Sequence, residues 1–253
     1  SDVYKRQGDF LAVRLFLHSN LGGYLAAVGP NMATNNMVKN ITSVYKTPLI
    51  EINTKCVFTN TTPISAYRGA GRPEANYYME RLIETAAKEM GIDRMELRMR
   101  NHIRPDQIPY KAPSGQNYDS GNFSAILKNG LKFSDWENYE TRREISRKKG
   151  LLRGIGVSNY LEVTAPVETE MGGIRFEENG DITIITGTLD YGQGHAAPFA
   201  QILHSQLGVP FEKIRLLQGD SDELITGGGT GGSKSIMALS LIHISEPTRR
   251  RGI

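Results

Sequence analysis

The first hundred positions contain two stretches rich in β-forming residues, followed by apolar residues at helical spacing. Residues 10–18 and 51–59 predict strands. A helix is predicted to begin at Pro73, which suits a first helical turn, and to end at Gly91. Its apolar positions are Tyr78, Leu82, Ile83, Ala86 and Met90. Asp93 and Glu96 form a capping-box pattern, so a second helix is expected over residues 94–101.

The rest of the chain groups its predicted helices and strands instead of alternating them strictly. Helical patterns cover residues 122–131, a segment from a Ser134/Glu137 capping box to Gly150, and residues 195–207. Strands are predicted at residues 152–163, 167–176, 182–189 and 214–218. Glu178-Asn179-Gly180-Asp181 is typical of a hairpin turn. This grouping favours an α+β fold over a doubly wound sheet.

Composition favours a protein with a hydrophobic core and no nucleic-acid surface. The 253 residues are 39% hydrophobic with a net charge of +3, and the basic residues are scattered. Cys56, the only cysteine, can form neither a disulfide within the chain nor a thiolate metal cage. Its position in a predicted strand favours a buried thiol. No run approaches the roughly 18–20 apolar residues that span a bilayer, so we expect a cytoplasmic protein with no membrane span and no nucleic-acid partner.

Three glycine-rich loops are the candidates for ligand binding. Residues 66–72 place Gly69 and Gly71 between two arginines, just before the helix at Pro73. Residues 191–195 lie between a predicted strand and a predicted helix, where free N–H groups are expected to donate hydrogen bonds to an anion. Residues 226–235 contain five glycines. Glycine lets the backbone approach a ligand closely, but the second loop alone is also compatible with a tight turn and the third with a flexible loop.

The spacing within these loops excludes the common nucleotide and hydrolase motifs. After Gly69 and Gly71, a dinucleotide-binding fingerprint needs a glycine where Glu74 stands. A P-loop needs lysine directly after glycine, but Ser233 separates Gly232 from Lys234. Residues 156–160 lack the final glycine of a nucleophile elbow, and no H-E-x-x-H occurs.

Together the three loops resemble the molybdenum-binding large subunit of the xanthine dehydrogenase and aldehyde oxidase family, most closely its carbon monoxide dehydrogenase-like branch. The resemblance covers residues 8–238 and rests on the order and spacing of its motifs, since each loop alone is unspecific. Further matching segments are Phe58-Thr59-Asn60, Glu80-Arg81, Glu96-Leu97-Arg98 with Asn101, and Tyr118-Asp119-Ser120-Gly121.

The resemblance implies molybdopterin with molybdenum as the cofactor, in the cytosine dinucleotide form. The pterin dithiolene holds the metal in this family, so no side chain is expected as a metal ligand. Arg68, Gly69 and Ala70 are expected beside the molybdenum, with the backbone of Arg68 and of Gly232 nearest the metal. Pterin contacts are expected from Tyr191, Gly192, Gln193, Gly194 and His195. The residues expected to line the pterin and its phosphate are Thr230, Gly232, Ser233 and Ser235.

The implied reaction is oxidative hydroxylation of an aldehyde or an N-heterocycle with oxygen from water. Electrons would pass to Fe–S and FAD partner subunits, in a dimer of heterotrimers. The family's glutamate base has no counterpart in this chain, so no residue is assigned as catalytic and the piece is expected to be inactive alone. Carbon monoxide dehydrogenases carry a copper-binding cysteine in the loop equivalent to residues 68–72, which has none here. An organic substrate is therefore expected.

The resemblance also implies two incomplete molybdopterin-binding domains. Residues 8–110 correspond to the end of the first, residues 111–121 to a linker, and residues 122–238 to the start of the second. Residues 1–7 and 239–253 resemble translated sequencing-adapter DNA and are expected to be extraneous. The alternative is a non-catalytic homologue that binds a cofactor or nucleotide and keeps the fold.

Overall fold

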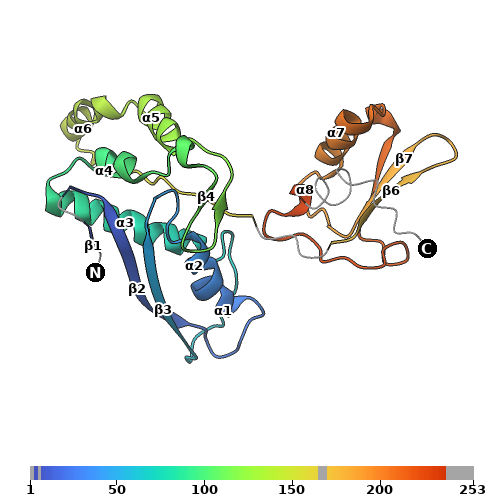
Figure 1. The fold of residues 1–253 in the computed structure, drawn as a ribbon, viewed down its shortest axis with the longest axis horizontal. Helices are drawn as coiled ribbons and strands as arrows, with labels where there is room; N and C mark the ends of the chain where they lie inside the picture. The colour runs from blue at the N-terminus through green and yellow to red at the C-terminus, as the bar shows by residue number, and fades with distance from the viewer. Residues whose placement is uncertain (1–2, 5–6, 165–169, 238–253) are drawn as a thin grey trace. The chain divides into compact units, whose positions relative to one another are not determined.

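The computed structural model describes residues 3–4, 7–164 and 170–237. Contacts divide the chain into two units, Ser1–Glu162 and Val163–Ile253, and each is described by itself (Figure 1). The expected C-terminal tail, residues 239–253, lies outside the described residues. Of the expected N-terminal tail, Val3–Tyr4 form the short strand β1.

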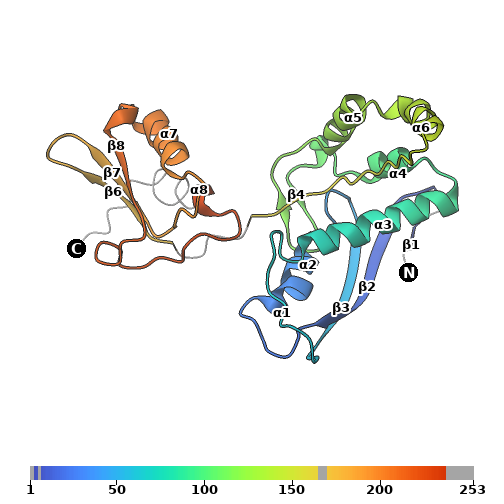
Figure 2. The same cartoon turned by 180° about the vertical axis from the view of Figure 1, so that it is seen from behind.

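The first unit is built on three strands covered on one face by a long helix. Strands β2 and β3 run parallel, with Ala12 opposite Leu49, and β1 pairs antiparallel with β2. Helix α3 lies across this sheet (Figure 2). Its residues Ala75, Met79 and Ile83 pack with Val13 in the core. The elements up to this helix are β2 (Phe10–Asn20), α1 (Gly29–Asn31), the π-helix η1 (Met32–Asn36), α2 (Met37–Asn40), β3 (Leu49–Val57) and α3 (Arg72–Met90).

The predicted helix–glycine–helix unit is confirmed. Gly91 adopts a left-handed conformation (φ 66°) and ends α3. Asp93 then accepts hydrogen bonds from the backbone N–H groups of Met95 (2.8 Å) and Glu96 (2.9 Å), which begins α4 (Arg94–Asn101). Local capping chemistry therefore fixes both boundaries.

A buried charge cluster joins α3 to α4. Arg98 is fully buried and contacts Glu80 (2.8 and 3.0 Å) and Glu84 (2.8 Å). The Tyr45 hydroxyl donates to Glu80 (2.5 Å), and burial together with the Glu80 charge raises the pKa of Tyr45. Every member of the cluster therefore has a partner, as buried charges require.

The remainder of the first unit differs from the sequence prediction at two places. Ser134 ends α5 instead of opening the next helix, and α6 begins five residues later, after Asp135 takes a left-handed conformation (φ 51°) and the turn η3. Residues 152–163 form no strand. The elements of this part are η2 (Pro105–Gln107), β4 (Tyr110–Lys111), β5 (Asn117–Tyr118), α5 (Phe123–Phe133), η3 (Trp136–Asn138) and α6 (Tyr139–Lys148).

The segment expected to link two domains, residues 111–121, is part of the first unit. It contributes to the two-stranded β4–β5 sheet, and Tyr118 is buried with its hydroxyl on the carbonyl oxygen of Ser43 (2.5 Å). Contacts place the boundary between the two units at Glu162/Val163. The assignment of residues 8–110 and 122–238 to two domains stays a prediction.

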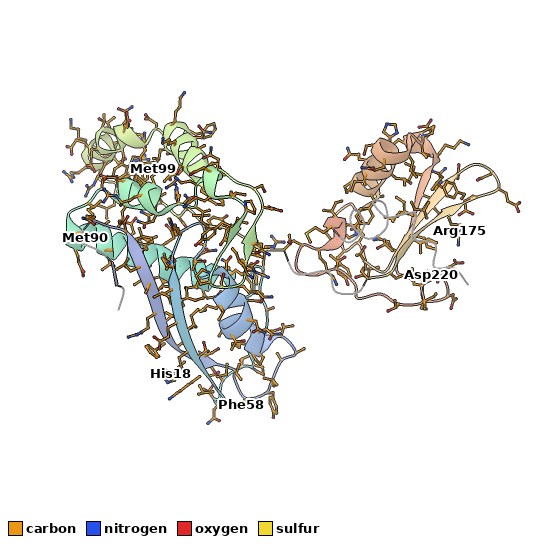
Figure 3. The ribbon with its side chains drawn as sticks, viewed as in Figure 1. His18, Phe58, Met90, Met99, Arg175 and Asp220 are labelled. Atoms are coloured by element: carbon orange, nitrogen blue, oxygen red, sulfur yellow. The ribbon has the colours of Figure 1, made fainter. Side chains whose placement is uncertain are left out.

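The second unit is a three-stranded sheet with one helix packed on it. Strands β6 and β7 form the predicted hairpin, in which the Glu177 N–H donates to the carbonyl oxygen of Asp181 (2.9 Å). Strand β8 pairs parallel with β7, and the crossover between them is α7, whose Phe199 and Leu203 are fully buried. Arg175 of β6 is labelled in Figure 3. Its guanidinium forms ion pairs with Glu177 and Glu223. The elements are β6 (Gly172–Phe176), β7 (Ile182–Thr186), α7 (Ala196–Leu207), η4 (Phe211–Lys213), β8 (Ile214–Leu217) and α8 (Ser235–Met237).

The α+β fold is thus confirmed, and the prediction of a buried Cys56 is wrong. Cys56 is exposed, because it lies on the half of β3 that extends beyond the helix-covered core. Phe58, just after β3, is also exposed at the same end of the sheet (Figure 3). Within the described ranges, no helix is long and apolar enough to cross a membrane.

Candidate functional site

The loop before α3 has three consecutive residues in left-handed conformations. The φ angles are 93° at Gly69, 47° at Ala70 and 93° at Gly71. A Cβ on Gly71 would lie 2.0 Å from the carbonyl oxygen of Met32, so only glycine fits there. The backbone therefore turns sharply, with the side chains of Tyr67 and Arg68 exposed beside it.

Two polar side chains hold this loop in place. Asn36, the last residue of η1, donates from Nδ2 to the carbonyl oxygen of Ala70 (2.8 Å). The buried guanidinium of Arg72 donates to the carbonyl oxygen of Gly69 (3.4 Å) and lies 3.3 Å from a carboxylate oxygen of Glu162. These contacts fix a backbone conformation that Ala70 would otherwise adopt only at a cost in free energy.

A cavity of about 600 Å³ begins beside this loop and follows α3. Its volume is within the range of small-molecule sites. Its residues come from α3, from α4 and from the irregular segment 155–162: Pro73, Asn76, Tyr77, Glu80, Arg81, Glu84, Arg94, Ile155, Gly156, Val157, Ser158, Tyr160 and Glu162. Charged groups are therefore numerous along its wall.

In the second unit, the turn before α7 already contains an anion. Asp190 Oδ1 accepts from the backbone N–H groups of Gly192 (2.7 Å), Gln193 (2.7 Å) and Gly194 (3.2 Å), and Oδ2 accepts from that of His195 (2.7 Å). These bonds, led by those from His195 and Gly192, lower the pKa of Asp190 to about 2. The expectation of free N–H groups at this turn is therefore wrong, because a neighbouring carboxylate occupies all four.

Gln193 and His195 in this turn differ in whether their side chains can reach a ligand. The Tyr191 N–H donates to Gln193 Oε1, which uses the amide oxygen. The Gln193 side chain is exposed, so its NH₂ group can still donate to a ligand. His195 is buried, stacks on Phe199 with ring centroids 4.9 Å apart, and contacts Gln218 through Nδ1 (3.1 Å). Gln193 can therefore reach a ligand, whereas His195 packs inside the unit.

The third glycine-rich loop, residues 226–235, lies directly against this turn and is called the glycine tract below. Thr230 Oγ1 accepts from the Leu189 N–H (3.1 Å) and contacts Ser235 Oγ (3.2 Å). The Gly229 N–H donates to the carbonyl oxygen of Gly187 (3.2 Å), and a Cβ on Gly229 would lie 2.9 Å from the Tyr191 hydroxyl. The second and third predicted loops thus form one continuous surface.

The structure places the predicted residues in two groups. Tyr191, Gly192, Gln193, Gly194, His195, Thr230, Gly232, Ser233 and Ser235 belong to the second unit, and Arg68, Gly69 and Ala70 to the first. Among the described residues, no three His, Cys, Asp or Glu side chains gather in a way that could hold a metal ion.

Asn36 and Asp190 shape these loops and were not predicted from the sequence. Asp190 could have been found, because an aspartate just before a glycine turn commonly accepts the backbone N–H groups that follow it. Asn36 had no such signal, since 34 residues separate it from Ala70.

Comparisons with known proteins match two separate parts of the chain. Two models described as "Molybdopterin cofactor-binding domain" match residues 3–102 and 129–240. The carbon monoxide dehydrogenase large chain of Afipia carboxidovorans is 30% identical over 91% of this chain and 31% of its own length. The xanthine dehydrogenase molybdenum-binding subunit of Escherichia coli O157:H7 is 30% identical over 84% of this chain and 28% of its own.

The solved structures give the same result. Quinoline 2-oxidoreductase from Pseudomonas putida 86 matches with a TM-score of 0.80 and 26% identity over 93% of this chain and 31% of the other. The chain thus spans about a third of the relatives that it matches. It belongs to the molybdenum-binding large subunits of the xanthine dehydrogenase and aldehyde oxidase family.

Proposed function

We propose that the full-length protein is a molybdenum hydroxylase that inserts water-derived oxygen into an aldehyde or an N-heterocycle. The observation that carries the proposal is the continuous surface formed by the Gly192–His195 turn and the glycine tract, joined at Leu189 and Thr230 (3.1 Å), inside a region matched by a cofactor-domain model. When bound, molybdopterin in its cytosine dinucleotide form supplies the two-electron redox chemistry.

The donor set of this surface fits such a cofactor. The Gln193 NH₂ group can donate to an oxo group or a heterocycle edge, and the hydroxyls of Thr230, Ser233 and Ser235 can donate to phosphate oxygens. Gly192, Gly194 and Gly232 let the pterin approach the backbone, and Tyr191 covers one side. His195 contributes by packing under the turn instead of touching the ligand. From the family resemblance, the backbone of Arg68, Gly69 and Ala70 in the first unit, and that of Gly232 in the second, would face the metal.

The substrate is an organic carbon centre in this proposal. The loop at residues 68–72 contains no cysteine, which leaves no soft ligand there for copper. The relatives are named for carbon monoxide, xanthine and quinoline, and the last two are N-heterocycles. The general base is assigned to no residue of this chain. Electrons leave to Fe–S and FAD subunits of a cytoplasmic dimer of heterotrimers, a proposal that rests on the family resemblance.

The direct test is metal and cofactor content of the full-length protein, purified with its partner subunits. We expect about one molybdenum per large subunit, with pterin fluorescence after oxidative release. Gln193→Ala should lower cofactor occupancy or turnover, whereas Gln201→Ala, on the exposed side of α7, should change neither. Neither molybdenum nor pterin in a well-folded assembly would contradict the proposal. A Gln193→Ala variant indistinguishable from the Gln201→Ala control would contradict the role of the turn.

A further inference from the structure

A carboxylate is buried beneath the glycine tract. Glu170 comes just before β6, and its side chain has no exposed surface. Its Oε1 accepts from the Gly228 N–H (3.3 Å), and its Oε2 lies 3.4 Å from Lys234 Nζ. One side chain therefore contacts the tract near its beginning and near its end.

The backbone around this carboxylate has no room for side chains. A Cβ on Gly187 would lie 2.3 Å from Glu170 Oε1 and 2.6 Å from the Cα of Gly227. A Cβ on Gly227 would lie 2.7 Å from the carbonyl oxygen of Gly187, whereas a Cβ on Gly228 would meet Glu170 Oε2 at an ordinary contact distance of 3.4 Å. The end of β7, the start of the tract and the carboxylate are thus packed together, and the glycines at these positions make the contact possible.

The charge of Glu170 explains why its side chain contacts Lys234. A carboxylate removed from water is costly unless it is paired, and Lys234 is the cation beside it. Lys234 lies between Ser233 and Ser235, whose hydroxyls belong to the proposed phosphate-binding surface. The ion pair therefore sets where these two residues lie relative to Gly228.

We infer that the Glu170–Lys234 pair is a positioning device that holds the glycine tract in the shape required for the cofactor phosphate. The inference rests on the proposed function for its ligand, but not for the geometry of the tract. Glu170 acts through the tract and is not a catalytic base. Lys234, in turn, is engaged by Glu170, so the phosphate meets the hydroxyls and not the ammonium group.

Hydrogen exchange of the cofactor-free full-length protein tests the geometry independently of the proposed function. We expect amides of residues 227–235 to exchange on the order of tenfold faster in Glu170→Gln, because a charge-assisted contact is lost. Glu178→Gln, exposed in the β6–β7 hairpin, is the matched control. Lys234→Met should give a similar increase, and Lys234→Arg should retain most of the protection. Exchange in Glu170→Gln equal to that of the control would overturn the inference.

A double-mutant cycle then separates positioning from direct binding. If the pair acts as a unit, Glu170→Gln and Lys234→Met together should exchange little faster than either alone. Additive effects would show that the two residues act independently and would overturn the inference. A Lys234→Met variant that loses far more cofactor than Glu170→Gln would assign Lys234 to the phosphate and would also overturn it.

The rate at which the holoenzyme loses its cofactor tests the link between the ion pair and the ligand. In the holoenzyme we expect both single variants to lose molybdenum and pterin at least twofold faster than the control during mild heating. Faster exchange with unchanged cofactor loss would overturn the link to the ligand. A wild-type protein that never contains molybdenum would refute the proposed function, while the exchange results would still decide the role of the pair in the tract.

Discussion

Replacing Arg98 with methionine should strongly destabilise the first unit, because this guanidinium is fully buried among carboxylates. It contacts Glu80 and Glu84 and also donates to the carbonyl oxygen of Arg94 (2.9 Å). Removing one partner of a buried ion pair costs about 3–5 kcal/mol, because the remaining charge is left uncompensated. Within the part of the chain that the structure describes, the Tyr45 hydroxyl would be the remaining donor to Glu80.

Urea unfolding followed by tryptophan fluorescence measures this loss of stability in the first structural unit, which contains the tryptophan. Trp136 is the only tryptophan, and the Arg94 guanidinium lies 4.8 Å from its ring centroid. With a denaturant slope of about 2 kcal/mol/M, the midpoint should fall by about 1.5–2.5 M. Adding Glu80→Gln to the variant should recover part of the loss, because it removes the unpaired charge. This recovery separates electrostatics from loss of packing.

The control is Arg143→Met, whose side chain is 47% exposed on α6. It should change the unfolding free energy by less than about 0.5 kcal/mol. An Arg98→Met variant within about 1 kcal/mol of this control would refute the reasoning, as would a double variant less stable than the single one.

Three further predictions concern the loops and a buried histidine. Gly71→Ala should destabilise the protein more than Gly115→Ala in thermal unfolding: both glycines have positive φ, but a Cβ meets the Met32 carbonyl oxygen only at position 71, so equal losses would contradict the close-packing explanation. Burial, with the Arg98 charge, lowers the pKa of His102 to about 4. Because the unfolded histidine binds a proton below about pH 6.5 and the folded one does not, stability should fall from pH 6.5 towards pH 4, and His102→Gln should lack this part of the pH dependence in urea titrations. Asp190→Ala should speed amide exchange at residues 192–195, with Asp190→Asn intermediate; in the wild type, protection should persist above the ordinary aspartate pKa and be lost as the pH approaches 2, and unchanged exchange in the alanine variant would refute the cap.

The elements that the sequence predicted correctly are those with local signals. Gly91, Asp93 and the Asn179-Gly180 turn act on neighbouring backbone, so their consequences can be worked out within a few residues. Residues 152–163 have β-forming composition but no neighbouring strand, since pairing depends on partners far away in the chain. Ser134 had two possible roles, and the left-handed Asp135 after it decided for the end of α5.

The candidate site was predictable in its glycines but not in what holds them. Gly69, Gly71 and Gly229 are visible as breaks in the pattern, whereas the partners Asn36 and Glu170 act across 34 and 58 residues. Glu170 has no sequence signal, because a glutamate next to a strand has no distinctive spacing. Burial, which gives it its role, is a property of the folded unit alone.

The carboxylate of Asp190 also determines how the turn before α7 responds to the buffer. A helix N-terminus with vacant N–H groups collects sulfate or phosphate, and its ligand affinity falls as salt rises. Here the competing anion is a side chain of the same protein, so its effective concentration at the turn is high. Buffer anions therefore cannot displace it from the backbone N–H groups. Ligand affinity at this position should therefore depend little on ionic strength, and purification in phosphate should leave the turn unchanged.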